Sequence, residues 1–257
     1  MPARAVGVKG TYWQPGEKIS IGFLGGTPAQ QDMVKRVSAQ WLKYCGLSFN
    51  WTDADLADVR IAFNPGNGSW SYLGTDCRFT DKETMNFGWL DEAVILHEFG
   101  HMLGLAHEHQ NPNRPINWNK PQVYADLGQA PNYWDKATID HNLFAKYTPD
   151  AVDSSPLDGQ SVMMYQVPAR WTLDGFSAAF NTQLSQVDKE WIGRLYPASP
   201  VHDAYKQLFT RRRDLSRLTE PMLVRMGKQL GVEIDQRELK AQNVATIAEK
   251  LGLANFD

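Results

Sequence analysis

Residues 97–107 read HEFGHMLGLAH, and this string constrains the chain more than any other stretch. His97 and His101 are four residues apart, so on a helix their imidazoles project from one face, one turn apart. Glu98 adjoins the first histidine, where a carboxylate can reach a metal-bound water without itself binding the metal. The spacing therefore predicts a helix that carries two metal ligands and a general base.

A third ligand is predicted at His107, six residues beyond His101. Gly104 makes this position usable, because a glycine can adopt a left-handed conformation, end the helix and turn the chain back towards the metal. Three neutral nitrogen ligands favour a single catalytic Zn²⁺ and leave one position open for water. We expect zinc to lower the pKa of that water towards about 7 while Glu98 accepts its proton, which indicates amide hydrolysis.

The other histidines fit this pattern less well. His109 follows the third ligand by only two residues, which favours a surface or supporting role over ligation. His141 and His202 have no partners at ligand spacing and are interpreted as structural or solvated.

Composition excludes some classes of partner. The net charge of −3 lacks the basic excess that binding to a nucleic acid backbone requires. No apolar run approaches the roughly 18 to 20 residues of a membrane span, and the first residues lack the apolar segment of a secretory signal. We therefore expect that the chain binds no nucleic acid and no membrane, and that it is either a cytoplasmic chain or a processed form of a secreted one.

Cys45 and Cys77 match no zinc-thiolate spacing, and thiols are favoured over a single disulfide.

The first 105 residues or so are predicted to form a mixed sheet with two helices. One helix begins at Thr27, with Pro28 at its first position and Gln30 completing a capping box, and its stop is predicted at Gly46. The second begins at Asp91 and runs up to Gly104. Alternating or aromatic runs predict strands at 18–26, 47–51, 58–63, 69–74 and 84–89.

The second half is less regular. Residues 110–184 show weak periodicity, so mostly irregular structure with one or two short helices is expected. A further helix is predicted near Ser185, which forms a pattern like a capping box with Asp188. Beyond a linker at 197–203, amphipathic patterns predict three helices, at 203–213, 220–230 and 236–252. The predicted domains are 1–200 and a helical appendage at 201–257.

The histidine string is the signature of the metzincin zinc peptidases, which also require a methionine-containing turn beneath the metal. Residues 161–165, SVMMY, resemble the Ser-x-Met-x-Tyr turn of the astacin family within that clan. The resemblance implies that Met163 lies under the zinc and that Tyr165 ligates zinc or stabilises the developing oxyanion. It also implies a structural partner role for Glu108, which follows the third histidine. The resemblance covers roughly residues 11–197.

This resemblance implies an α+β fold: a metzincin-like catalytic domain with a mixed twisted sheet, two long helices and an irregular C-terminal subdomain, followed by a small all-α appendage. The implied activity is that of a zinc-dependent endopeptidase in which a zinc-bound water attacks the peptide bond. Polypeptide substrates would bind in extended form along the edge strand at Ser69–Gly74. Astacins usually carry two disulfides, which two cysteines cannot supply. The alternative is an inactive zinc-binding homologue whose helical tail binds a protein partner.

Overall fold

The computed structural model describes residues 5–113, 115–154, 156–198, 205, 208–209, 212–230, 232, 234, 240–251 and 253. The chain folds into two compact units. One holds Leu96–Trp191 with two short segments, the residues before Trp13 and Ser71–Asp76. The other holds Trp13–Trp70, Cys77–Ile95 and the described residues from Ile192 onward.

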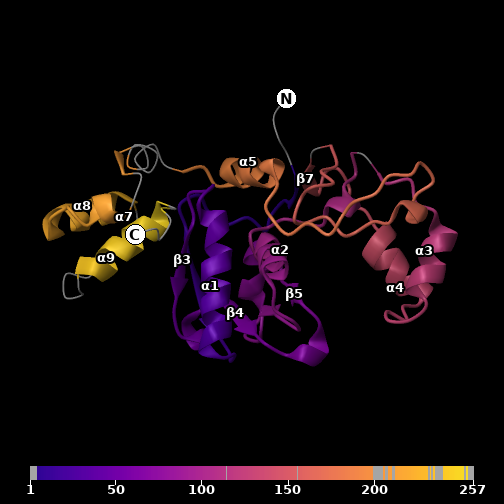
Figure 1. Cartoon of the computed structure of the whole chain (residues 1–257), viewed down its shortest axis with the longest axis horizontal. Coiled ribbons are helices and arrows are strands. Elements are labelled where there is room, and N and C mark those ends of the chain that lie inside the picture. Colours follow the sequence, from indigo (N-terminus) through magenta and orange to yellow (C-terminus); the bar gives the residue numbers. More distant parts are fainter. Residues whose placement is uncertain are drawn as a thin grey trace. The chain divides into compact units, whose positions relative to one another are not determined.

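The second of these units contains most of a five-stranded sheet, of which β3 (Ser48–Trp51), β4 (Val59–Ala62) and β5 (Trp70–Ser71) are labelled in Figure 1; with β2 (Lys18–Phe23) and β6 (Met85–Asn86) the order is β3-β2-β4-β6-β5. The strand β2 pairs in parallel with β3 and β4, and β4 pairs in parallel with β6. All five strands fall within the predicted runs, but β5 and β6 have only two residues each. The predicted strand at 69–74 gives way to a 3₁₀ helix from Gly74.

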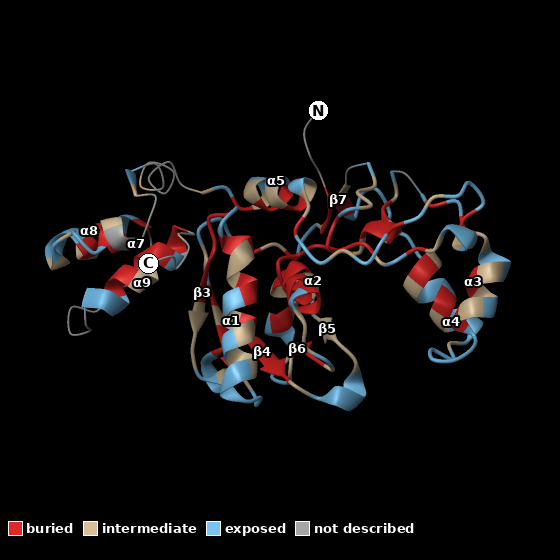
Figure 2. Ribbon diagram, viewed as in Figure 1, coloured by how far each residue is buried: buried red, intermediate tan, exposed pale blue. Residues whose placement is uncertain are grey.

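Helix α1 (Pro28–Leu42) starts as the sequence predicts. Thr27 Oγ1 accepts the Gln30 N–H and the Gln30 side chain accepts the Thr27 N–H, which completes the capping box. Figure 2 shows buried residues along one side of this helix, and they are Val34, Val37, Ser38, Trp41 and Leu42. The helix ends at Leu42 rather than at Gly46, because the Tyr44 N–H donates three residues back, to the Trp41 carbonyl, instead of four.

The histidine-bearing unit contains a two-stranded antiparallel sheet that the sequence did not predict, formed by β1 (Val6–Val8) and β7 (Val152–Ser154). Two short helices lie in the segment expected to be mostly irregular, namely α3 (Lys120–Leu127) and α4 (Lys136–Ile139), and a π-helical turn continues from α4. Their apolar faces share one hydrophobic cluster that includes Val123, Ile139, Leu143, Met164 and Val167. Helices α2 (Glu92–Met102) and α5 (Gln186–Leu195) form where predicted.

The C-terminal helices have a core of their own. These are α7 (Arg212–Leu215), α8 (Glu220–Leu230) and α9 (Lys240–Lys250). The prediction for α8 is confirmed, whereas most of the predicted helix at 203–213 and the start of the one at 236–252 lie outside the described residues. The buried side chains of these helices pack together in one hydrophobic cluster, which includes Leu215, Leu223, Leu230, Val244, Ile247 and Leu251. The α+β fold followed by helices is therefore as predicted.

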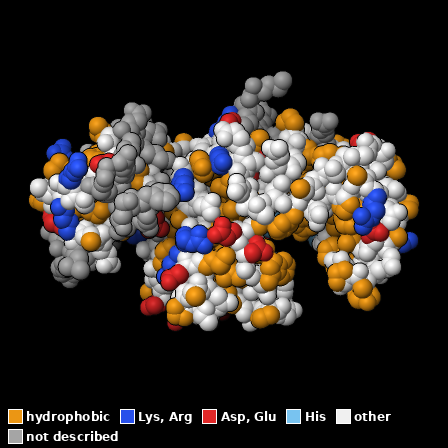
Figure 3. Space-filling model, viewed as in Figure 1, with side chains coloured by type: hydrophobic (Ala, Val, Ile, Leu, Met, Phe, Trp, Pro, Cys, Tyr) orange, Lys and Arg blue, Asp and Glu red, His pale blue; other side chains and the backbone are white. Residues whose placement is uncertain are grey.

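Cys45 and Cys77 are both buried thiols and form no disulfide, as favoured from the sequence. On the face shown in Figure 3, basic and acidic side chains of the described residues are interspersed rather than gathered by sign. Among the helices that the structure describes, none is long and apolar enough to cross a membrane.

Candidate metal centre

Helix α2 presents the first two histidines. Asp91 caps it by accepting the Val94 N–H through Oδ1 at 2.8 Å. The four-residue spacing then brings the His97 and His101 rings together, with centroids 4.8 Å apart. This part of the site follows from local helix geometry alone.

Gly104 turns the chain as predicted. Its φ is +86°, and the Gly104 and Leu105 N–H groups donate to the carbonyls of His101 and Gly100, a Schellman ending. A Cβ at Gly104 would lie 3.0 Å from the Tyr12 ring. Strand β1 then holds the exit from the turn, because the Val8 N–H donates to the Gly104 carbonyl and the Ala106 N–H donates to Val6. The next residue is His107.

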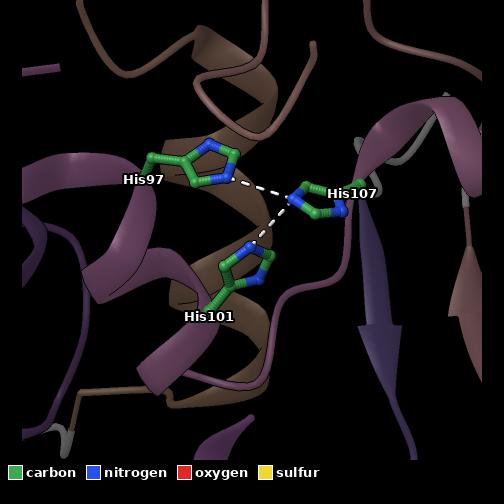
Figure 4. A group of neighbouring side chains, drawn as sticks. All are labelled: His97, His101 and His107. Carbon is green, nitrogen blue, oxygen red and sulfur yellow. Dashed lines mark hydrogen bonds between the residues drawn. The ribbon is translucent and has the colours of Figure 1, made fainter. Parts of the chain in front are cut away.

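The three imidazoles converge on one point (Figure 4). The Nε2 atom of His107 lies 3.2 Å from that of His97 and 3.0 Å from that of His101. The Nδ1 atoms of His97 and His101 lie 2.8 Å and 2.7 Å from the carbonyls of Val162 and Leu105. Because a carbonyl only accepts, each Nδ1 carries the proton, and both Nε2 atoms face His107 as lone pairs.

This arrangement fits a bound cation. His107 Nε2 has at most one proton and cannot satisfy two facing lone pairs, whereas a metal accepts all three. Ligand nitrogens about 2.0–2.1 Å from a tetrahedral zinc would be about 3.3 Å apart, close to the separations observed. Burial lowers the pKa of His97, lowers that of His101 to about 3 and lowers that of His107 well below its usual value. The rings are therefore neutral, the form that binds zinc.

Glu98 lies beside these ligands on α2 and is 5% exposed. Its Oε2 atom is buried and has no hydrogen-bond partner among the residues that the structure describes, and burial raises the pKa of the carboxyl group to about 8. A buried carboxylate oxygen that lacks a protein donor is suited to accept a proton or a hydrogen bond from a bound water.

The turn at Ser161–Tyr165 packs against the ligand segment. The Val162 carbonyl accepts from His97, and the Met163 carbonyl accepts the Glu108 N–H at 3.1 Å. Met163 is buried, and the Tyr165 ring centroid lies 4.3 Å from that of His107. Burial, with a smaller effect of Glu98, raises the pKa of Tyr165 to about 12. The turn thus meets the site through two carbonyls and one phenol ring.

The sequence of residues 6–199 matches the family model for Astacin, a family of peptidases. The chain belongs to the astacin family. This family consists of zinc metalloendopeptidases, and the three converging histidines fit its zinc.

Individual relatives agree with this membership. The solved structure of myroilysin is 40% identical with a TM-score of 0.73, over 76% of this chain and 100% of that one. High choriolytic enzyme 1, a hatching enzyme zinc-protease from Oryzias latipes (Medaka fish), shares the fold with a TM-score of 0.51 at 18% identity, over 74% of this chain and 96% of that one. Protein SpAN of Strongylocentrotus purpuratus is 30% identical over 158 residues, which are 56% of this chain and 24% of that protein. The match thus spans about a quarter of the length of Protein SpAN.

Glu108 and His109, which follow the third histidine, are both buried. Glu108 is fully buried and accepts the Asp158 N–H through Oε2, while its Oε1 has no partner in the described part of the chain. Burial raises the pKa of Glu108 to about 8. A surface role for His109 is wrong, because this side chain is 1% exposed. Its Nε2 lies 2.8 Å from the Asn142 carbonyl, and its ring packs 4.6 Å from that of Tyr165. A supporting role is what remains for His109.

Sequence reasoning missed several groups of this astacin site. The carbonyls of Val162 and Leu105 orient two ligands, yet a backbone carbonyl leaves no residue signature. Strand β1 was missed because three residues, VGV, are too short for a periodic pattern. Asp188 was noted only as part of a helix cap, although its carboxylate also reaches the turn at Ser161.

Proposed function

We propose that the chain hydrolyses peptide bonds of protein substrates, with His97, His101 and His107 as zinc ligands and Glu98 as the general base. The observation that carries this proposal is the convergence of three neutral imidazoles, with a buried and unpartnered Glu98 oxygen on the same helix. Zinc, when bound, polarises a substrate carbonyl and makes a water molecule more acidic.

Glu98 supplies the proton transfers. Its buried Oε2 atom has no hydrogen-bond partner among the described residues, so this oxygen is open to accept the proton of the attacking water. The proton taken from the attacking water is then available for the leaving amine, which must gain one as the peptide bond breaks. The same carboxyl group serves both steps.

Tyr165 is proposed to stabilise the oxyanion that develops on the substrate carbonyl. Its raised pKa, about 12, keeps the phenol protonated and able to donate a hydrogen bond. The residue lines a cavity of about 310 Å³ together with His107, Gln110, Lys146 and Tyr147. This cavity offers space for a substrate side chain beside the scissile bond.

The supporting residues are assigned from their contacts. Gly104 is proposed to place the third ligand, while Met163 and Glu108 join the turn to the ligand segment. The edge strand β5 within Ser69–Gly74 is proposed to align extended substrate, because an edge strand has one side open to a further strand.

The boundary between a peptidase domain at 1–200 and an appendage at 201–257 stays a prediction. The end of the family match near residue 199 and the separate core of the C-terminal helices support it. A protein partner for these helices likewise stays a prediction.

Profiling the cleavage of a peptide library by the whole chain tests the proposal. We expect internal cleavage that a zinc chelator abolishes and added zinc restores, because hydrolysis depends on the metal. Cleavage that persists in chelator would contradict the metal-dependent mechanism. Zinc-loaded protein that cuts no peptide in the library would favour the inactive, protein-binding alternative.

A further inference from the structure

Asp188 lies in the first turn of α5 and is fully buried. It takes part in a capping box, because its N–H donates to Ser185 Oγ and its Oδ2 accepts the Ser185 N–H, both at 2.9 Å. A capping role explains these two hydrogen bonds. It does not explain the two further hydrogen bonds that the Asp188 carboxylate accepts.

The Asp188 carboxylate accepts two further hydrogen bonds from the turn beneath the ligands. Ser161 Oγ donates to Oδ1 at 2.6 Å, and the Val162 N–H donates to Oδ2 at 3.0 Å. Ser161 Oγ in turn accepts the Met163 N–H at 3.0 Å. One carboxylate therefore holds the Val162 backbone directly and the Met163 backbone through the Ser161 hydroxyl.

Val162 connects this carboxylate to the metal site. Its N–H points to Asp188, and its carbonyl accepts the proton of His97 Nδ1 at 2.8 Å. That hydrogen bond sets the tautomer of His97 and turns Nε2 towards the other two ligands. A displacement of Val162 would therefore rotate or release a ligand ring.

The carboxylate is balanced by dipoles rather than by a cation. Among the described residues, no lysine or arginine nitrogen forms an ion pair with it, and its donors are two backbone N–H groups and one hydroxyl. Burial raises the pKa of Asp188, and these hydrogen bonds act in the opposite direction. The donors from the turn and the carboxylate thus stabilise each other.

We propose that Asp188 is a positioning residue for the metal site, which holds Val162 so that the Val162 carbonyl orients His97 towards zinc. The inference rests on the proposed ligand set but not on peptide hydrolysis. It assigns Asp188 a role in metal affinity beyond the stability of α5.

The experiment compares Asp188→Asn with Ser185→Ala in the whole chain. Ser185→Ala removes the hydroxyl that caps α5 and that donates to Asp158 Oδ2, and it leaves the contacts of Asp188 with Ser161 and Val162 in place. Zinc affinity is measured by competition with a chelator, and the unfolding temperature is measured without zinc.

We expect Asp188→Asn to weaken zinc binding by about 10- to 100-fold, the usual effect of removing a group that orients a ligand. Ser185→Ala should lower the unfolding temperature while its zinc affinity stays within about twofold of that of the unaltered chain. Substitution by Co²⁺ adds a second measurement, because its absorption bands respond to ligand geometry. These bands should change in Asp188→Asn and not in Ser185→Ala.

Equal zinc affinity in Asp188→Asn and the unaltered chain would overturn the proposal, as would equal losses in the two variants. If Asp188→Asn does not fold, Ser161→Ala removes one of the two contacts from the turn and should weaken zinc binding more than Ser185→Ala does. An unaltered chain that binds zinc but cuts no peptide would refute the proposed function and leave this comparison intact. An unaltered chain that binds no zinc would refute both.

Discussion

Buried charged or polar side chains occur in two regions, the ligand segment His97–His107 and the C-terminal helices α8 and α9. The hydrogen-bonding groups of these side chains have different kinds of partner in the two regions. In the ligand segment, Glu98 has a buried oxygen to which no described residue donates, and three imidazole nitrogens face one another. In α9, the buried ammonium of Lys250 donates to the Gly46 carbonyl at 2.8 Å. The contrast indicates that the first region is built around a ligand, whereas the buried ammonium of Lys250 has a protein acceptor.

The largest effect is expected for Glu98→Gln, which tests whether the unpartnered oxygen is functional. Turnover should fall by roughly 10²- to 10⁴-fold, because the attacking water loses its base, while bound zinc is retained. Rates of peptide cleavage and metal content by atomic absorption check this. Glu92→Gln on the exposed start of the same helix is the matched control. Turnover near that of the unaltered chain in Glu98→Gln would show that another group is the base.

A smaller loss is expected for Tyr165→Phe, which removes only the phenol oxygen. Turnover should fall by roughly 10²-fold or less, since zinc and Glu98 remain, and KM should change little. Tyr124→Phe, whose hydroxyl bonds Asp140 instead, should leave turnover unchanged. An unchanged rate on several substrates in Tyr165→Phe would remove Tyr165 from the mechanism.

Gly104→Ala tests the turn that delivers the third ligand. A left-handed conformation costs a non-glycine residue roughly 1–2 kcal/mol, and the new Cβ would also press on the Tyr12 ring. Gly10→Ala is a close control, because Gly10 has a φ of +90° with nothing within 4 Å of a Cβ. Urea unfolding should show a larger loss in the free energy of unfolding for Gly104→Ala than for Gly10→Ala. Zinc binding should also be weaker in Gly104→Ala and unchanged in Gly10→Ala. Equal zinc affinity in both variants would mean that the turn does not set the position of His107.

The sequence predicted local features of the molecule better than contacts between distant segments. The positions of His97 and His101, the capping box at Thr27 and the left-handed Gly104 depend on neighbours a few residues away, and the structure has all of them. The pairing of β1 with β7 joins residues more than 140 positions apart, and the contact of Asp188 with Val162 spans 26. Such contacts depend on the whole fold, so a single sequence carries little signal for them.

The smallest effect is expected for Lys250→Met, which tests whether the buried charge of α9 is purely structural. Burial lowers the pKa of the Lys250 ammonium, so the folded protein releases this proton at a lower pH than the unfolded chain, whose lysine titrates near 10.4. Between these two pKa values the unfolded chain binds more protons, and the free energy of unfolding should therefore rise with pH.

Lys250→Met should lack this rise, whereas exposed Lys228→Met should keep it, and urea unfolding from pH 7 to 10 checks both. Zinc affinity and cleavage rate should be the same in both variants and in the unaltered chain, because the partner of Lys250 is a backbone carbonyl of the same unit. If Lys250→Met instead altered zinc affinity or cleavage, the C-terminal helices would be coupled to the metal centre. The buried charge would then belong, like Glu98, to the functional part of the chain.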